Sequence, residues 1–239
     1  MRLALPGLLL ALAGCAPTVT HGPRVEPGLF FGGTGGLLLT RDTALAPDVL
    51  TPQWVPFARY GIAGKPGGVA GSLGVALGSS AESPVEADAY LQLPSSDPVW
   101  AYGTGLVASR ALAMPYVQAG RSFARGYEVF ATQAYVRRDD FNDRQAVLLE
   151  SAPTVVRPRY WATTVALRRR EGPLALSLQV TGAFGHYDER VRDSGPGTRS
   201  RPLRAVSTSL TTELDVALFV RDFLRITRRP IPRDNPPER

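Results

Sequence analysis

The side chains able to do chemistry are few in this chain of 239 residues, which contains one Cys and two His. His186 precedes Asp188 and Glu189 closely, and such a group could offer a general base or two metal ligands. The sequence has no Gly-x-Ser-x-Gly or His-Glu-x-x-His motif that would complete a mechanism. These residues are therefore expected to be polar loop residues, and an enzyme using His186 with Asp188 or Glu189 ranks third among the functions considered.

Two other motifs carry weak chemical signals. Residues 139–143 (DDFND) are acidic and could bind Ca²⁺, but they lack EF-hand spacing, and flanking arginines can pair with the carboxylates. Residues 103–108 (GTGLVA) match a loose dinucleotide pattern, yet they lie within a strand-like segment instead of opening a helix. A single Cys excludes disulfides and Cys-based zinc sites. We expect no catalytic residue, no metal and no cofactor.

The single cysteine, Cys15, lies at the end of a leader-like segment. Arg2 precedes an apolar run over residues 3–13, which is shorter than the roughly 20 residues of a transmembrane helix and is typical of a signal peptide. Residues 12–15 read Leu-Ala-Gly-Cys, and they resemble the lipobox of bacterial lipoproteins. An ordinary signal peptide with a chance cysteine is the alternative.

The lipobox resemblance implies a specific modification. Cleavage would fall between Gly14 and Cys15, the Cys15 thiol would carry a diacylglycerol, and the new amine would be acylated. Two or three acyl chains hold a protein stably in a membrane, whereas one binds reversibly. Ala16 stands where an Asp would favour the inner membrane, which indicates the outer membrane. Membrane lipid bound through acylated Cys15 is the expected partner.

The positive charge does not indicate a nucleic-acid partner. The formal net charge is +6, and every basic residue except Lys65 is an arginine. The arginines lie mostly near predicted turns, for example at 168–170 and 199–204, whereas nucleic acid would favour a stripe or a helix face. We therefore expect no nucleic acid, and the location makes other envelope proteins the candidate macromolecular partners.

The pattern of the remaining chain predicts an all-β domain. The 24 Gly and 21 Pro argue against a helical bundle. Turns at Arg125-Gly126 and Glu171-Gly172-Pro173 predict hairpins, and hence an antiparallel meander of roughly ten strands, closed into a β-barrel. The predicted organisation is a signal peptide (1–14), a lipidated Cys with a Pro-rich tether containing His21 (15–28), a barrel-like domain (29–226) and a disordered Pro/Arg tail (227–239). The predicted strands are 29–40, 55–63, 69–78, 86–93, 99–108, 115–124, 126–137, 146–156, 159–170, 174–184 and 204–218.

The last predicted strand has an ambiguous end. Residues 214–226 (LDVALFVRDFLRI) can be a capped helix, since Asp215 follows two threonines, or they can continue the strand. The prediction is a strand that ends near Leu218. The chain then runs past Phe219 and Phe223 into the tail, whereas small outer-membrane barrels usually finish on a strand with a terminal aromatic residue.

The two faces of the predicted strands differ in an informative way. Segments 69–78, 99–108 and 174–184 contain no charged residue, and large apolar residues alternate with small ones. A soluble sheet shows water a charged face. The small residues, such as Ser72 and Ser177, are therefore expected to line a lumen, and the apolar residues to meet lipid or protein. Embedding in the membrane and a periplasmic location both remain open.

Aromatic residues agree with a membrane barrel. The stretch from Met114 to Gly120 (MPYVQAG) resembles a strand-start pattern of small outer-membrane barrels, with Gln118 where glycine is frequent. Aromatic residues near strand ends predict an interfacial girdle. The residues of this predicted girdle are Trp54, Tyr60, Tyr90, Trp100, Tyr102, Tyr116, Tyr160 and Trp161.

The favoured function is a non-enzymatic structural or interaction barrel of the cell envelope. The alternative is a lipocalin-like periplasmic binding module, because small inward residues such as Ala70 and Ala175 would leave room for a small apolar ligand.

Overall fold

The fold was analysed in a computed structural model of the chain. It describes residues 19–40, 53–63, 68–80, 83–110, 112–138, 141–142, 154–191 and 199–227. Gly14, Cys15 and the signal peptide lie outside the described residues, as do residues 228–239 of the predicted tail. The same holds for most of the acidic loop 139–143 and of the predicted strand 146–156.

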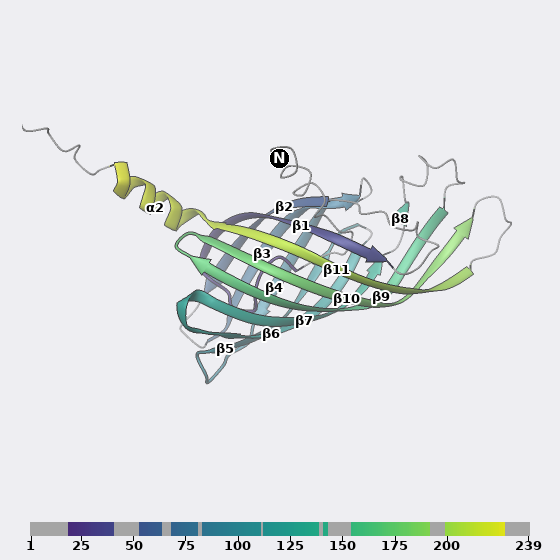
Figure 1. The fold of residues 1–239 in the computed structure, drawn as a ribbon, viewed down its shortest axis with the longest axis horizontal. Helices are drawn as coiled ribbons and strands as arrows, with labels where there is room; N and C mark the ends of the chain where they lie inside the picture. The colour runs from purple at the N-terminus through teal and green to yellow at the C-terminus, as the bar shows by residue number, and fades with distance from the viewer. Residues whose placement is uncertain are drawn as a thin grey trace, which may run out of the picture.

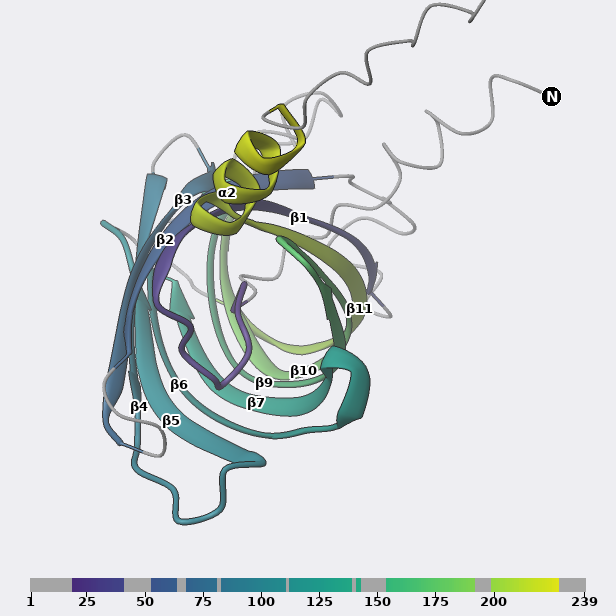
Figure 2. The same cartoon turned by 90° about the vertical axis from the view of Figure 1, so that its left-hand side faces the viewer.

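The described strands form a closed barrel (Figures 1 and 2). Ten antiparallel strands pair in chain order, β7 pairs with β9, and β1 closes the ring on β11. The short β8 pairs with β9 outside this ring. This confirms the predicted all-β barrel of about ten strands. The strands are β1 (Gly28–Thr40), β2 (Gln53–Ala63), β3 (Ala70–Ser80), β4 (Ser83–Gln92), β5 (Trp100–Ala108), β6 (Leu112–Ser122), β7 (Tyr127–Arg138), β8 (Phe141–Asn142), β9 (Thr154–Glu171), β10 (Leu174–Val191) and β11 (Arg199–Asp215).

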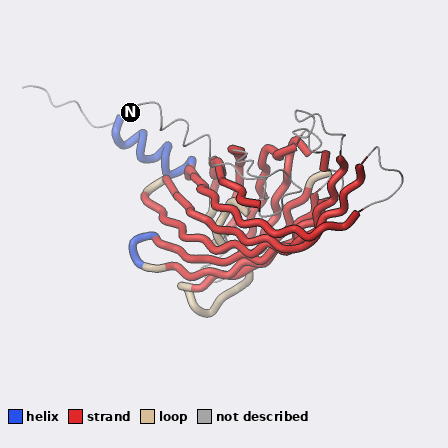
Figure 3. Tube along the Cα trace, turned by 45° about the vertical axis from the view of Figure 1, so that its right-hand side comes forward, coloured by secondary structure: helices blue, strands red, loops and turns tan. Residues whose placement is uncertain are grey.

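The barrel has two distinct ends. β1 begins and β11 ends at the same end, where Phe30 is paired with Asp215, and helix α2 (Val216–Thr227) projects from it (Figures 1 and 3). We call this end the α2 mouth and the opposite end the far mouth. The predicted turns at 125–126 and 172–173 both lie at the α2 mouth, where Gly126 and Gly172 adopt positive φ angles of 74° and 59°.

The two faces of the strands have opposite chemistry. In β3, Ser72 is buried while Leu73 is 66% exposed, and in β10, Ser177 is buried while Leu178 is 56% exposed. The small polar residues face the lumen and the large apolar residues face outward, as the sequence predicted. Further exposed apolar residues on the strands are Phe31, Tyr60, Ile62, Val75, Leu77, Val85, Leu91, Leu106, Val117, Val129, Val165, Leu167, Leu174, Leu176, Val180 and Val206.

The end of the last strand differs from the prediction. β11 ends at Asp215, and residues from Val216 onward form α2, so the predicted strand as far as Leu218 is wrong. The cause is local, because the Asp215 carboxylate accepts a hydrogen bond from the Leu218 backbone amide at 3.1 Å, as an N-cap residue does. Among the described helices, none has the length and apolar character needed to cross a bilayer.

Candidate functional site: the occupied lumen

The lumen of the barrel contains a segment of the chain itself. Residues 19–27, here called the luminal segment, run through the inside of the barrel before β1 begins (Figure 2). Val19, His21, Pro23 and Val25 are buried, and His21 is only 1% exposed. The prediction placed these residues in a tether outside the folded domain, whereas the structure places them at its centre.

Contacts with β4 hold the luminal segment in an extended path. The His21 Nε2 atom lies 3.1 Å from Asp88 Oδ2. Two residues further along both the luminal segment and β4, the Tyr90 hydroxyl donates to the Pro23 carbonyl oxygen at 2.9 Å. After two more, the Val25 amide donates to the side chain of Gln92 at 2.7 Å. This constant spacing means that the segment follows the inner wall alongside β4, in the same direction.

His21 lies at the centre of a polar network. Its Nε2 atom is 3.1 Å from the Tyr116 hydroxyl oxygen, and that hydroxyl donates to Asp88 Oδ1 at 2.7 Å. Its Nδ1 atom is 2.7 Å from the Gly22 carbonyl oxygen. The Tyr90 and Tyr116 rings stack nearly parallel with their centroids 5.9 Å apart, and the His21 ring lies 4.7 Å from that of Tyr90. The network fixes the imidazole from both nitrogens and from one ring face.

Gln118 explains the departure from the strand-start pattern. Its side-chain amide donates to the His21 carbonyl oxygen at 3.0 Å and to the Thr132 hydroxyl at 2.9 Å. A glycine at this position would supply neither hydrogen bond. Gln118 therefore ties the luminal segment to β6 and β7.

A buried ion cluster holds the luminal segment near the α2 mouth. Glu26 pairs with Arg170 and lies 3.4 Å from Arg168, both on β9. Arg168 also binds Glu213 at 2.6 Å, and Arg170 binds Asp215 at 2.7 Å, both on β11. Buried charges are costly unless they are paired. Glu26 supplies one of the carboxylates that these two arginines require.

The cluster continues around the barrel wall. Arg59 on β2 pairs with Glu213, and its guanidinium carbon lies 4.6 Å from the centre of the Phe30 ring. Glu128 on β7 lies 3.5 Å from Arg168, which is also its register partner on β9. Four strands thus contribute charged side chains to one layer across the lumen.

Two glycines of β5 make room for the luminal tyrosines. A Cβ atom on Gly105 would overlap the Tyr116 ring, and a Cβ atom on Gly103 would come within 2.5 Å of the Tyr90 hydroxyl oxygen. The residues 103–108 lie within a strand, as predicted, and their glycines permit close packing instead of binding a phosphate.

The other sequence-predicted candidates are not part of this network. His186 lies on β10, which extends to Val191 and does not end at 184 as predicted, and its side chain is exposed. It is paired in register with Arg159 and Pro202. Within the described ranges, no group of three His, Cys, Asp or Glu side chains could hold a metal ion.

The side chain of Trp54 lies outside the described part of the structure, and the other seven residues of the predicted aromatic girdle divide into two sets. Tyr60, Trp100, Tyr102 and Trp161 are exposed on the outer surface, as a girdle requires. For the inward set the prediction is wrong, because a two-residue period turns these side chains to the other face of their strands. The buried aromatic residues of the predicted girdle are Tyr90, Tyr116 and Tyr160.

The inner wall of the barrel is polar around the lumen centre, and towards the far mouth it carries a buried hydrophobic cluster that includes Leu112, Met114 and Val136. Ser72, Ser177 and Ala175 do face inward, as predicted. Gln179 and Thr211 line the same interior, and the Gln179 side chain donates to the Thr211 hydroxyl at 3.2 Å. The luminal segment runs between these walls (Figure 2). The interior therefore differs from an open apolar cup, because it holds a segment of the chain itself.

Comparisons with known proteins show a similarity in barrel shape only. No family model and no curated protein matches the sequence. The NanC porin aligns with a TM-score of 0.40 and 8% identity over 78% of this chain and 100% of that one. The KdgM porin in complex with disordered oligogalacturonate aligns with a TM-score of 0.39 and 6% identity over 77% of this chain and 98% of that one. The outer membrane protein AlkL, solved in lipid bilayers, aligns with a TM-score of 0.37 and 14% identity over 85% of this chain and 96% of that one. At such low identity and TM-score, these similarities carry no argument about function.

Proposed function

We propose that this protein is a lipid-anchored β-barrel embedded in the bacterial outer membrane, with a non-enzymatic structural or interaction role and a lumen closed by its own luminal segment. The observation that carries the proposal is the outer surface of the barrel, which is covered by large apolar side chains, whereas the inside holds paired charges and hydrogen-bonded polar side chains beside a buried hydrophobic cluster.

The outer surface supports embedding. Leu73, Val165 and Leu178 are each about half exposed or more, and many similar residues surround them on neighbouring strands. Monomeric soluble proteins rarely expose a contiguous apolar surface of this extent. A bilayer removes this cost, and a closed barrel leaves no unpaired strand edge in the hydrocarbon. The barrel strands have nine residues or more, which is sufficient for a tilted crossing.

The occupied lumen supports a structural role over transport. Polar contacts fix the luminal segment at its centre through His21 and near the α2 mouth through Glu26. A barrel that holds a segment of its own chain in this way presents its loops and mouths to partners. Other envelope proteins are the partners that fit this arrangement.

The two parts of the proposal can be tested separately with a Cys15→Ser variant. Wild-type protein should incorporate labelled palmitate, and Cys15→Ser should not, because the variant lacks the thiol that accepts the lipid. Unlipidated Cys15→Ser that reaches the outer membrane should still resist carbonate extraction and should migrate faster on gels when unheated, since the barrel itself spans the bilayer.

Different results would contradict different parts. Palmitate incorporation that persists in Cys15→Ser would overturn the lipid anchor. Release of Cys15→Ser by carbonate, together with a mobility that does not depend on heating, would overturn embedding of the barrel.

A further inference from the structure

The direction of the luminal segment has a consequence for the topology of the chain. β4 runs from the far mouth to the α2 mouth, because β3 and β4 are joined at the far mouth and Gln92 ends β4 at the other. His21, Pro23 and Val25 contact positions 88, 90 and 92 of β4 in that order. The segment therefore travels from the far mouth towards the α2 mouth.

Contacts with β6 show the same direction independently. β6 also begins at the far mouth, at Leu112, and ends at the α2 mouth. The His21 ring lies beside Tyr116, and a Cβ atom on Gly120 would come within 2.8 Å of the Pro23 ring. Higher numbers in the segment again meet higher numbers in the strand.

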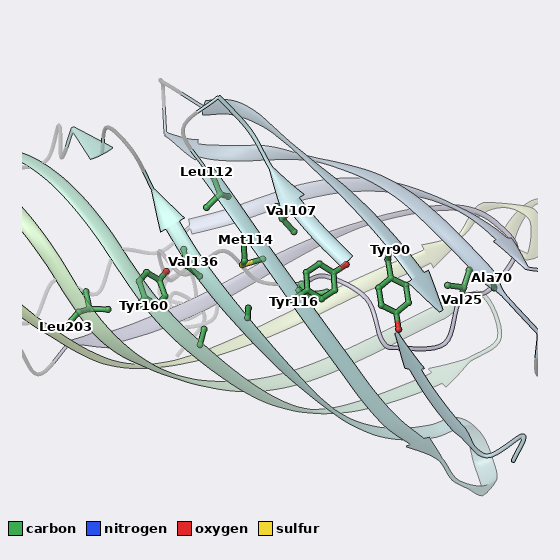
Figure 4. Close-up of a cluster of buried hydrophobic side chains, with 13 residues drawn as sticks. Val25, Ala70, Tyr90, Val107, Leu112, Met114, Tyr116, Val136, Tyr160 and Leu203 are labelled. Atoms are coloured by element: carbon green, nitrogen blue, oxygen red, sulfur yellow. The ribbon is translucent and has the colours of Figure 1, made fainter. Parts of the chain in front are cut away.

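The two ends of the segment lie at different depths. Glu26 pairs with Arg170, one residue before the end of β9 at the α2 mouth. Figure 4 shows the buried hydrophobic cluster inside the barrel, in which Val25 lies beside Ala70, which begins β3 at the α2 mouth, while Leu112 lies towards the far mouth. The chain therefore reaches the α2 mouth only at the start of β1.

The number of crossings follows from this path. An even number of antiparallel strands returns the chain to the side from which it started, so the ten barrel strands place Gly28 and Asp215 at one mouth. The luminal segment adds an eleventh passage through the same barrel. An odd number of passages separates the two ends of the chain.

We propose that the luminal segment is an eleventh passage across the membrane, which places the chain before Val19, with the lipid on Cys15, at the far mouth and α2 at the other. This inference rests on the proposed function. Four Cα–Cα steps separate Cys15 from Val19, a reach of at most about 14 Å. A return to the α2 mouth would have to cover the path that residues 19–27 take, and that path is twice as long in residues. The acyl chains therefore enter the bilayer leaflet at the far mouth.

Thiol labelling of intact cells tests the topology. Lipid occupies the only native cysteine, so a single introduced cysteine is the only free thiol. Pro17→Cys reports on the chain before the luminal segment, and Thr227→Cys, at the end of α2, is the matched control. A membrane-impermeant maleimide should label one of the two in intact cells and the other only after lysis. Heat-dependent gel mobility of both variants establishes that each barrel has folded.

The outcomes separate this inference from the function on which it rests. Equal labelling of the two thiols in intact cells, whether both react or neither does, overturns the eleventh passage when the barrels are folded and resist carbonate. Carbonate release with heat-independent mobility overturns the proposed function and this inference together.

Discussion

At the scale of single residues, the lumen depends on side chains that join distant parts of the sequence. His21 and Gln118 are 97 positions apart, yet they meet through one hydrogen bond. Glu213 serves two arginines, Arg59 and Arg168, which come from opposite halves of the chain. Each of these side chains is buried, so removing one leaves its polar partner without a hydrogen-bond or charge partner and without water to replace it.

Gln118→Ala should loosen the luminal segment. The change removes the hydrogen bonds to the His21 carbonyl and the Thr132 hydroxyl, at a cost of about 1–3 kcal/mol for buried partners. Hydrogen exchange of residues 19–27 should become faster by about tenfold or more. The control is Gln133→Ala on β7, whose side chain bonds Thr163 on the outer face. Unchanged exchange in Gln118→Ala would contradict the role given to this side chain.

Glu213→Gln should destabilise the whole barrel. It removes the charge that faces Arg59 and Arg168, and breaking a buried ion pair costs about 3–5 kcal/mol. The measurement is the free energy of unfolding in urea. Glu171→Gln is the matched control, because Glu171 is 80% exposed and its pair with Arg169 should contribute about 0–1 kcal/mol. Equal losses in the two variants would show that the ion cluster does not stabilise the fold.

At the scale of elements, the strands could be predicted and the luminal segment could not. The faces of β3 and β10 were predictable because lumen and exterior impose a two-residue period on every strand. The luminal segment has no strand partner, so its Pro and Gly residues gave the composition of a tether. Its burial depends on a barrel built from residues far along the chain. The one signal available in the sequence was the alternation of Val19, His21, Pro23 and Val25 with the small or polar residues between them.

Helix α2 was within reach of sequence reasoning. Asp215 is an N-cap residue, and a capped helix over residues 214–226 is one of the two structures that the sequence allows there, the other being a continued strand. The strand prediction failed because residues 214–218 also fit a two-residue period. The structure has the helix, and the Asp215 carboxylate caps its first turn.

The packing between β5 and β6 yields a prediction at this scale. Gly105→Ala should cost about 1–3 kcal/mol of unfolding free energy, because the new methyl group overlaps the Tyr116 ring. Gly182→Ala in β10 is the control, since a Cβ atom there has no neighbour within 4 Å. The two variants should differ clearly in urea unfolding. If Gly105→Ala is as stable as Gly182→Ala, the close approach of β5 to Tyr116 is not required.

At the scale of the whole molecule, the barrel has an apolar exterior around a lumen that holds a segment of the chain itself. The exterior was predictable from charge-free strands, whereas the segment in the lumen was not. Together they support the proposed barrel, which would span a membrane and be closed to ions. Neither feature depends on the lipid at Cys15, which is a separate part of the proposed function.

Ion conductance across a planar bilayer tests this central claim most directly. The wild-type protein should show no steady open-pore current, because residues 19–27 run through the lumen and Glu26 is held there by two arginines. A variant that lacks residues 16–26 and retains heat-dependent gel mobility should conduct ions steadily. A wild-type protein that conducts as well as the deletion variant, or a folded deletion variant that remains closed, would contradict the account.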